Sequence, residues 1–401
     1  MRLLFCLLPV SLLAQPTPNF RVEVVDNQIN IGYGMAIGDV DGDRRPDILM
    51  ADQHDIVWYK NPGGPRSAGR QSGGQPTDKQ SSRWVRYVLA SNLTPQDNVC
   101  IAARDLDGDG RVEVAVGAGW NPAETGDSTK SGAVFYLIRP SDPTKLWEAV
   151  RLPHEVTTHR MRWAKTGQNA YQLIVTPLHG LGNKNGSGRG VRVWGYEFPK
   201  DPRSRWKQHL VDSTMHLTHN FEVWEDASNT SLVIGGKEGS KIVRWAAGRW
   251  VPADAGSGQQ AASGMQDIGE IRRGNPRLLA AVQPMHGNRL VVYGQNASRN
   301  GDTLSTTLNQ GHALVCADWL GMGRDQIAVG WRNPNAEGKV GVRLFRPEAT
   351  GKWTEFAIDD SVRMACEDML TADLDNDGDL DLIASGRATL NVLIYWNQRI
   401  P

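Results

Sequence analysis

The chain has 401 residues, and its 44 Lys and Arg residues balance 44 Asp and Glu residues, so the formal net charge is zero. This balance argues against a nucleic-acid-binding protein or one held to membranes by a basic surface, because both need an excess of positive charge. Hydrophobic residues make up 40% of the chain, which excludes a disordered polypeptide and allows a large core.

The N-terminus predicts a secretory signal peptide over residues 1–15. One Arg is followed by an apolar run from Leu3 to Ala14, which is too short to span a bilayer. No later segment has the length of a transmembrane helix. We therefore expect a secreted or periplasmic protein whose mature part, residues 16–401, forms a single domain.

Three cysteines follow the signal peptide: Cys100, Cys316 and Cys366. An odd number cannot form a complete set of intrachain disulfides. Each lies in an apolar stretch, so we expect them to be small buried side chains with free thiols rather than one bridge with a thiol left over.

Along the chain, one pattern recurs seven times: an apolar strand, a loop, a second apolar strand, a Gly-containing turn and a third strand. Three copies have Asp-rich loops, at residues 32–63, 98–122 and 364–398. Four weaker copies occupy residues 158–180, 218–239, 264–287 and 311–335. Repeats of this length indicate an array of similar supersecondary units.

A fourth strand follows six of the seven units, at residues 83–90, 145–152, 205–212, 248–255, 303–310 and 352–359. The seventh unit has no residues left for one, but residues 20–27 form a strand ahead of the first unit. If this strand completes the last sheet, a ring of sheets closes without exposed edges. The sequence thus predicts an all-β, seven-bladed β-propeller closed by its N-terminal strand.

Acidic side chains alternate along three of the loops. Carboxylates spaced in this way in a Gly-bent loop converge on one point and suit Ca²⁺, a hard cation with oxygen ligands. We expect structural calcium at Asp39, Asp41, Asp43 and Asp47, at Asp105, Asp107, Asp109 and Glu113, and at Asp373, Asp375, Asp377 and Asp381. The sequences DVDGDRRPDI, DLDGDGRVEV and DLDNDGDLDL resemble the FG-GAP/VCBS repeats of integrin-type propellers, a resemblance that implies the fold alone.

Histidines mark one end of the expected propeller. His159, His219 and His312 fall at the start of innermost strands, and His54, His179 and His286 follow second strands. All six positions lie at the same mouth of the central channel, which is where a site is expected. Three imidazoles at one point are typical of a transition-metal centre with an open position.

We therefore predict that Zn²⁺ or another divalent transition metal is bound by His159, His179 and His219, with His286 and His312 as alternative ligands. Other side chains at this mouth are predicted to act in catalysis, namely His286, His312, Tyr33, Lys237, Arg332 and Arg387. A further set is predicted to contact the substrate, namely His54, Asn98, Trp120, Asn121, Trp331 and Glu367.

The stretch LPHEVTTHRMRW, with LIVTPLHGLGNKNGSGRGVRVW and HLTHNFEVW after it, resembles the propeller domain of aldos-2-ulose dehydratase. This resemblance implies a metal-dependent elimination of water from keto-sugars. Elimination next to a carbonyl requires a Lewis acid on the carbonyl oxygen and a base near neutrality, and imidazoles supply the second. We expect a carbon–oxygen lyase acting on a small sugar or glycan. The alternatives are a non-catalytic propeller that binds a glycan or protein, and a polysaccharide lyase of the propeller type.

Overall fold

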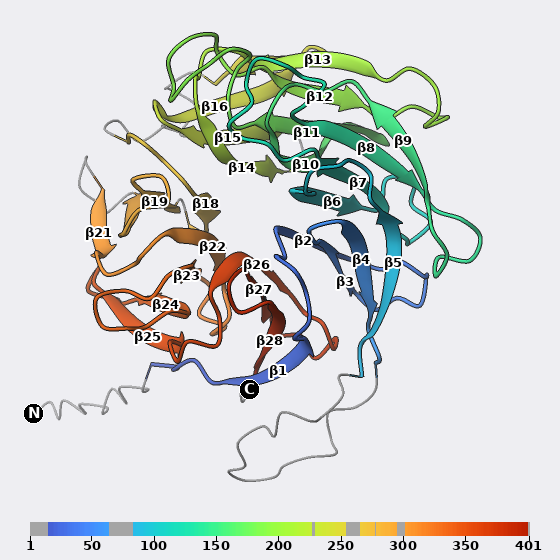
Figure 1. The fold of residues 1–401 in the computed structure, drawn as a ribbon. Helices are drawn as coiled ribbons and strands as arrows, with labels where there is room; N and C mark the ends of the chain where they lie inside the picture. The colour runs from blue at the N-terminus through green and yellow to red at the C-terminus, as the bar shows by residue number, and fades with distance from the viewer. Residues whose placement is uncertain are drawn as a thin grey trace, which may run out of the picture.

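The computed structural model describes residues 15–63, 83–226, 229–253, 265–276, 278–294 and 301–399. They form seven four-stranded antiparallel sheets around a central axis (Figure 1), which confirms the predicted propeller. None of the described segments is a helix that is long and apolar enough to cross a membrane. Apart from Gln15, the predicted signal peptide lies outside the described residues.

The sheets are numbered here as blades 1 to 7 in chain order, and each has its first strand nearest the axis. The innermost strands are β2 (Gly34–Gly38), β6 (Cys100–Arg104), β10 (Thr158–Gly167), β14 (Thr218–Glu225), β18 (Ile271–Gly274), β22 (Gly311–Ala317) and β26 (Cys366–Ala372). The second strands are β3 (Asp47–Ala51), β7 (Glu113–Ala118), β11 (Ala170–Pro177), β15 (Thr230–Gly236), β19 (Leu278–Gln283), β23 (Gln326–Trp331) and β27 (Asp381–Gly386).

The two outer strands of each blade complete the sheet. The third strands are β4 (Asp55–Lys60), β8 (Ala133–Ile138), β12 (Val193–Glu197), β16 (Gly239–Ala246), β20 (Arg289–Gly294), β24 (Val342–Pro347) and β28 (Asn391–Asn397). The outermost strands are β5 (Val85–Ser91), β9 (Glu148–Leu152), β13 (Lys207–Asp212), β17 (Arg249–Pro252), β21 (Asp302–Ser305), β25 (Trp353–Asp359) and, for blade 7, β1 (Phe20–Asp26).

The N-terminal strand closes the ring, as the sequence predicts. Strand β1 pairs antiparallel with β28, from Phe20 opposite Asn397 to Asp26 opposite Val392. The innermost strands contact their neighbours around the whole circle, including β26 with β2. Blades 1 and 7 are therefore adjacent although they lie at opposite ends of the chain (Figure 1).

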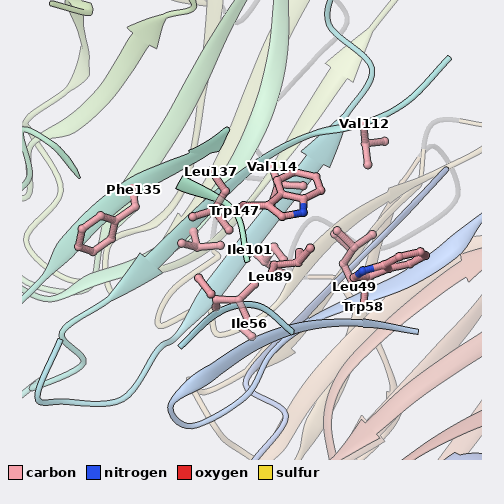
Figure 2. Packing of buried hydrophobic residues seen from close by; sticks show 14 of the residues in the cluster. Leu49, Ile56, Trp58, Leu89, Ile101, Val112, Val114, Phe135, Leu137 and Trp147 are labelled. Carbon is pink, nitrogen blue, oxygen red and sulfur yellow. The ribbon is translucent and has the colours of Figure 1, made fainter. Parts of the chain in front are cut away.

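The blades are held together by apolar layers between them. The second strands β3 and β7 are buried along their whole length, because a blade packs against a neighbour on both faces. Between blades 1 and 2, Leu49 and Trp58 pack near Val114 and Leu137 (Figure 2). Each large apolar side chain buried in this way contributes roughly 1.5–3 kcal/mol to folding, so the layers supply the main stabilisation of the ring.

Cys100, Cys316 and Cys366 are free thiols, as expected for small apolar packing residues. Burial raises the pKa of the Cys100 thiol to about 12. The thiolate is the reactive form, so this cysteine is inert near neutral pH.

Candidate functional site

β-Bulges near the start of four innermost strands build the candidate site. In β10, β14, β22 and β26 the pairing with the second strand skips one residue, and the residues skipped are His159, His219, His312 and Glu367. The register of β2 and β6, in blades 1 and 2, is continuous. A bulge leaves one residue out of the ladder and re-aims its side chain, so the four side chains are set apart from the ladders of their blades.

The three bulge histidines share one hydrogen-bond pattern. Nδ1 of His159 lies 2.8 Å from the His219 carbonyl oxygen, Nδ1 of His219 lies 2.9 Å from that of Gly269, and Nδ1 of His312 lies 2.6 Å from that of Glu367. In each case the carbonyl belongs to the next blade. A carbonyl only accepts, so Nδ1 carries the proton and Nε2 keeps its lone pair.

His286 reaches the same place from a loop in blade 5. Its backbone is left-handed, with φ of 54°, which is uncommon for a residue other than glycine. Gly269 occupies in blade 5 the position that His219 has in blade 4, and a methyl group there would lie 3.2 Å from both His286 N and Met285 Cα. The absence of a side chain at Gly269 therefore makes room for the loop that carries His286.

His219, His286 and His312, called the histidine group below, offer ring nitrogens that all lie within 4.8 Å of one another. Nε2 of His219 is 2.7 Å from Nε2 of His286, and the His312 ring lies 5.1 Å from that of His286. The sequence-based choice of His159, His179 and His219 as the ligand set is not the set that the fold brings together. The structure instead joins His219 to the two histidines that the sequence analysis gave as alternative ligands.

Glu270, which the sequence analysis missed, lies behind His219. Its Oε1 is 3.2 Å from His219 Nδ1, and its Oε2 accepts a hydrogen bond from Asn220 and lies 3.6 Å from Arg272. Burial alone would raise the pKa of Glu270, but its contacts with His219 and Arg272 lower that pKa to about 2. A charged carboxylate thus lies beside the Nδ1–H group that the Gly269 carbonyl accepts, a position typical of second partners behind metal-bound histidines.

A different pair stands behind His312. Arg332 donates through Nε and Nη2 to the two carboxylate oxygens of Glu367, both at 2.6 Å, and its Nη2 also lies 2.6 Å from His312 Nε2. Glu367 is 2% exposed, so this forked ion pair is shielded from water. Arg332 therefore uses the lone pair that His312 would offer to a metal, and a metal ion there would displace this one hydrogen bond.

The imidazoles of the site are kept neutral. Burial lowers the pKa of His159, His219 and His312 below the ordinary value, and nearby cationic groups lower it further for His159 and His312. Neutral imidazole is the form that binds metals and accepts protons. The site can therefore act as a set of ligands or as a base at neutral pH.

His159 lies at the edge of the histidine group. Its ring is stacked on Trp120 with centroids 5.0 Å apart, and it meets His219 edge-on at 4.7 Å. Within the part of the chain that the structure describes, its Nε2 makes no hydrogen bond. Trp120, predicted to stack on a sugar, is instead engaged with His159 on one face.

Tyr33 and Arg387 join the site from blades 1 and 7. The Arg387 guanidinium lies over the Tyr33 ring at 5.4 Å and is 3.6 Å from Glu367 Oε1. The Tyr33 hydroxyl donates to Asp97 at 3.0 Å, and burial together with Asp97 raises its pKa above the ordinary value. Tyr33 consequently stays protonated, and Arg387 lies between its ring and Glu367.

Three residues that were predicted to act at the site are instead engaged in contacts within the fold. Trp331 is 0% exposed, and its Nε1 donates to the Lys339 carbonyl, so it cannot stack on a sugar. Lys237 donates to the Asn185 carbonyl. His179 is bridged to Leu217 through the backbone and has a buried Nδ1 with no partner among the described residues.

The other predicted substrate contacts lie in turns at the same end of the propeller. Asn98 is buried and donates to the Asp52 carbonyl, and Asn121 donates to the Lys130 carbonyl. His54 is exposed in the turn between β3 and β4, and its carbonyl accepts from Asn92. Asn98 and Asn121 thus have roles in fixing turns.

The three acidic loops each bring carboxylates together at the far ends of the innermost strands. The groups whose oxygens lie within 4.8 Å of one another are Asp39, Asp41 and Asp43; Asp105, Asp107 and Glu113; and Asp373, Asp375 and Asp381. Asp47 instead accepts from backbone N–H groups, and Asp109 pairs with Arg111 and Arg139. Asp377 hydrogen-bonds the backbone of Asp379. In blade 1, Lys60 contacts Asp41 and Asp43.

Blade 6 shows how the same loop is built without a full set of carboxylates. The Gln326 side chain accepts from Leu320 N at 2.9 Å and donates to Asp318 at 3.2 Å. In blade 2, Glu113 accepts the equivalent bond from Leu106 N at 2.7 Å. The amide of Gln326 therefore supplies a donor that Glu113 lacks.

A pocket of about 510 Å³ lies beside the histidine group. It is lined by Ile31, Gln310, Arg332, Asn333, Arg387 and Ala388. A second cavity, of about 380 Å³, follows the innermost strands. Its polar lining includes Arg160, Arg162, Asn220, Glu222 and Asp368.

Two family models match parts of the chain. Residues 39–116 match the FG-GAP-like repeat, and residues 131–296 match the β-propeller domain of aldos-2-ulose dehydratase. The second match covers the two outer strands of blade 2, blades 3 and 4, and much of blade 5, and it includes His159, His219 and His286. Both resemblances seen in the sequence are thereby confirmed.

Solved structures show the same fold at low sequence identity. Two crystal structures of BBS1N in complex with ARL6DN, one soaked with mercury and one with lead, match with TM-scores of 0.52 and 0.55. In both, the identity is 12%, and the match covers 96% of this chain and 98% of that chain. A comparison with curated proteins found no match. These structures support the propeller fold alone.

Proposed function

We propose that this chain, part of which matches a dehydratase propeller, is a carbohydrate-acting carbon–oxygen lyase with its active site at the histidine group. The observation that carries the proposal is the convergence of His219, His286 and His312 from three blades, with Nε2 of His219 and of His312 left unprotonated by backbone carbonyls. A propeller needs no such set of neutral imidazoles for its stability. The signal peptide predicted at residues 1–15 makes a secreted or periplasmic enzyme part of the proposal.

A divalent transition metal, Zn²⁺ by preference, fits the histidine group. Three neutral imidazoles with an orienting carboxylate behind one of them, Glu270, form a ligand set that this ion favours. When bound, the ion would supply a Lewis acid for a substrate carbonyl. Arg332 would then keep its two bonds to Glu367 and lose only the one to His312.

His159, which the sequence analysis placed among the metal ligands, is the proposed base. Its Nδ1–H is held by the His219 carbonyl, which directs the lone pair to Nε2. The low pKa keeps this nitrogen unprotonated at neutral pH, although it also weakens the base. The reaction therefore depends on a substrate C–H bond made acidic by an adjacent carbonyl.

In the proposed elimination, His159 Nε2 takes the proton from the carbon next to the carbonyl. The electron pair of that C–H bond forms a C=C bond, and the neighbouring C–O bond breaks. The oxygen leaves as water or an alcohol after it receives a proton, which protonated His159 can return. Arg332 stays charged and stabilises negative charge on the substrate, because guanidinium does not lose its proton in proteins.

The proposal includes structural calcium in the three acidic loops of blades 1, 2 and 7. Each loop joins the first and second strands of its own blade, so an ion there would fasten two strands together. These loops lie at the opposite ends of the innermost strands from the histidines. Calcium would consequently affect stability rather than chemistry.

The test is an elimination assay. Zinc-loaded protein is incubated with aldos-2-uloses, and the conjugated carbonyl product is followed by ultraviolet absorbance. We expect turnover in the wild type, loss of kcat in His159→Gln, and retained turnover in His179→Gln, which changes a histidine outside the group. Zinc bound by the histidine group without turnover of any keto-sugar would refute the enzyme and favour a binding propeller.

A further inference from the structure

We propose that the pocket beside the histidine group binds a carboxylate, so that the substrate is an acidic sugar, a keto-sugar acid or a uronate, rather than a neutral one. This inference rests on the proposed function for the identity of the reaction. The evidence for the binding site itself is the pair of arginines that line the pocket, Arg332 and Arg387.

Both guanidinium groups have donors left over for a ligand. Arg332 uses Nε and Nη2 for Glu367 and His312, and its Nη1 makes no hydrogen bond to any described residue. Arg387 is held by the Tyr33 ring and by a 3.6 Å ion pair with Glu367, and its side chain makes no hydrogen bond within the described ranges. The Arg387 side chain is 41% exposed, so its donors can be reached from solvent.

The charge of the pocket fits a single negative charge. Its lining contains two guanidinium groups and no carboxylate, and the nearest acid that contacts them is Glu367. Two positive charges against one negative charge leave an excess of one. A carboxylate matches this excess and the planar fork of arginine, whereas a phosphate dianion would carry more charge than the pocket neutralises.

The arginines are already held in place. Glu367 fixes Arg332 through two bonds of 2.6 Å, and Arg387 lies over the ring of Tyr33, which is itself bonded to Asp97. Donors fixed in advance lose little conformational entropy when a ligand binds. This arrangement is typical of a binding subsite rather than of a surface ion pair.

The pocket also adjoins the proposed chemistry. Arg332 Nη2 lies 2.6 Å from His312 Nε2, so an anion on Arg332 would sit next to the histidine group. A carboxylate bound there would orient the sugar ring relative to His219 and His286. The charged group thereby determines which carbon faces the base.

The experiment measures binding of three probes of similar size, D-glucuronate, D-glucose and D-glucose 6-phosphate, by isothermal titration of the full-length mature protein. We expect glucuronate to bind about tenfold or more tightly than glucose, since charge-assisted bonds from arginine are the stronger class. Arg387→Met should bring glucuronate down to the affinity of glucose, and Arg387→Lys should give an intermediate affinity. Arg21→Met, a change to an arginine on the outer strand β1, is the control and should have no effect.

Each other outcome contradicts a specific part of the argument. Equal binding of glucuronate and glucose, or no effect of Arg387→Met, would overturn the carboxylate subsite. Tighter binding of the phosphate would show an anion site of a different class and would also overturn it. Arginine-dependent binding of glucuronate without any elimination would support the carboxylate subsite and refute the lyase. Turnover of neutral keto-sugars alone would support the lyase and refute the carboxylate subsite.

Discussion

His219 Nε2 lies 2.7 Å from His286 Nε2, in a contact that joins the innermost strand of blade 4 to a loop of blade 5. Around one zinc ion, with bonds of about 2.0–2.1 Å, two such nitrogens stand roughly 3.3 Å apart. Metal binding therefore requires these two rings to separate slightly. The His286 loop, in which backbone strain already exists, is the part that can move.

The first prediction concerns metal content. His219→Ala and His286→Ala should each abolish stoichiometric zinc after dialysis against zinc, because each removes one of three ligands. His179→Ala should retain it, because His179 is outside the group. Plasma mass spectrometry of the purified variants measures this. Equal zinc in all three variants would contradict the assignment.

The second prediction isolates Glu270 as a positioning residue. Glu270→Ala should weaken zinc binding by about 10–100-fold, the usual cost of removing a partner behind a metal-bound histidine. Glu270→Gln keeps a hydrogen-bond acceptor near His219 Nδ1 and should recover part of that loss. Competition titration with a zinc-sensitive dye gives the affinities. If both variants lose thermal stability but bind zinc normally, Glu270 has only a structural role.

The third prediction is loss of stability in acid for the metal-free protein. His159, His219 and His312 have lowered pKa values in the folded state, chiefly through burial. Below the ordinary histidine pKa of about 6.5, the unfolded state binds protons that the folded state does not, so the free energy of unfolding falls as the pH falls. Above that pH these residues have no effect on how the free energy of unfolding changes with pH.

His159→Asn tests this sign directly. Below pH ~6.5, chemical denaturation should show a slope of unfolding free energy against pH that is smaller than that of the wild type by up to about 1.4 kcal/mol per pH unit. Above pH ~6.5 the variant and the wild type should have the same slope, which serves as the internal control. An identical slope in wild type and His159→Asn would contradict the neutral state of His159.

The fourth prediction separates calcium binding from loop geometry in blade 2. Glu113→Gln should keep the bond from Leu106 N, as Gln326 keeps the equivalent bond from Leu320 N in blade 6. The variant should therefore match the wild type in thermal stability when a chelator is present and fall below it in calcium. Scanning calorimetry with and without calcium makes the comparison. A deficit that is the same in both conditions would mean that calcium does not bind there.

The repeat pattern predicted the ring of blades well because the same strands are buried in every blade. Apolar runs such as β3 and β7 are buried on both faces, so they stand out in the sequence, and the missing fourth strand of blade 7 identified β1 as its partner. Trp331 was misassigned for the same reason. The end of a second strand in this fold is as buried as its middle, and the Trp331 side chain is 0% exposed.

The details of the site could not be predicted because they depend on backbone geometry. Nothing in the sequence indicates that β10, β14, β22 and β26 bulge at the very residues that point away from the ladder. In blade 5 the residue whose carbonyl accepts from His219 is Gly269, and it has no side chain that a pattern of polar residues could reveal. The sequence therefore carries no signal for Glu270 beside it, nor for the room at Gly269 that lets His286 reach the histidine group.

The closure of the ring by β1 has a consequence for synthesis. Tyr33 follows the first strand to leave the ribosome, whereas Glu367 and Arg387 belong to the last blade translated. The edge of β1 stays unpaired until β28 is made, a long-range pairing that is slow to form. The pocket lined by Arg332 and Arg387 is therefore completed only after β28 has been made and has paired with β1, so a product stalled before blade 7 would hold folded blades but no finished pocket.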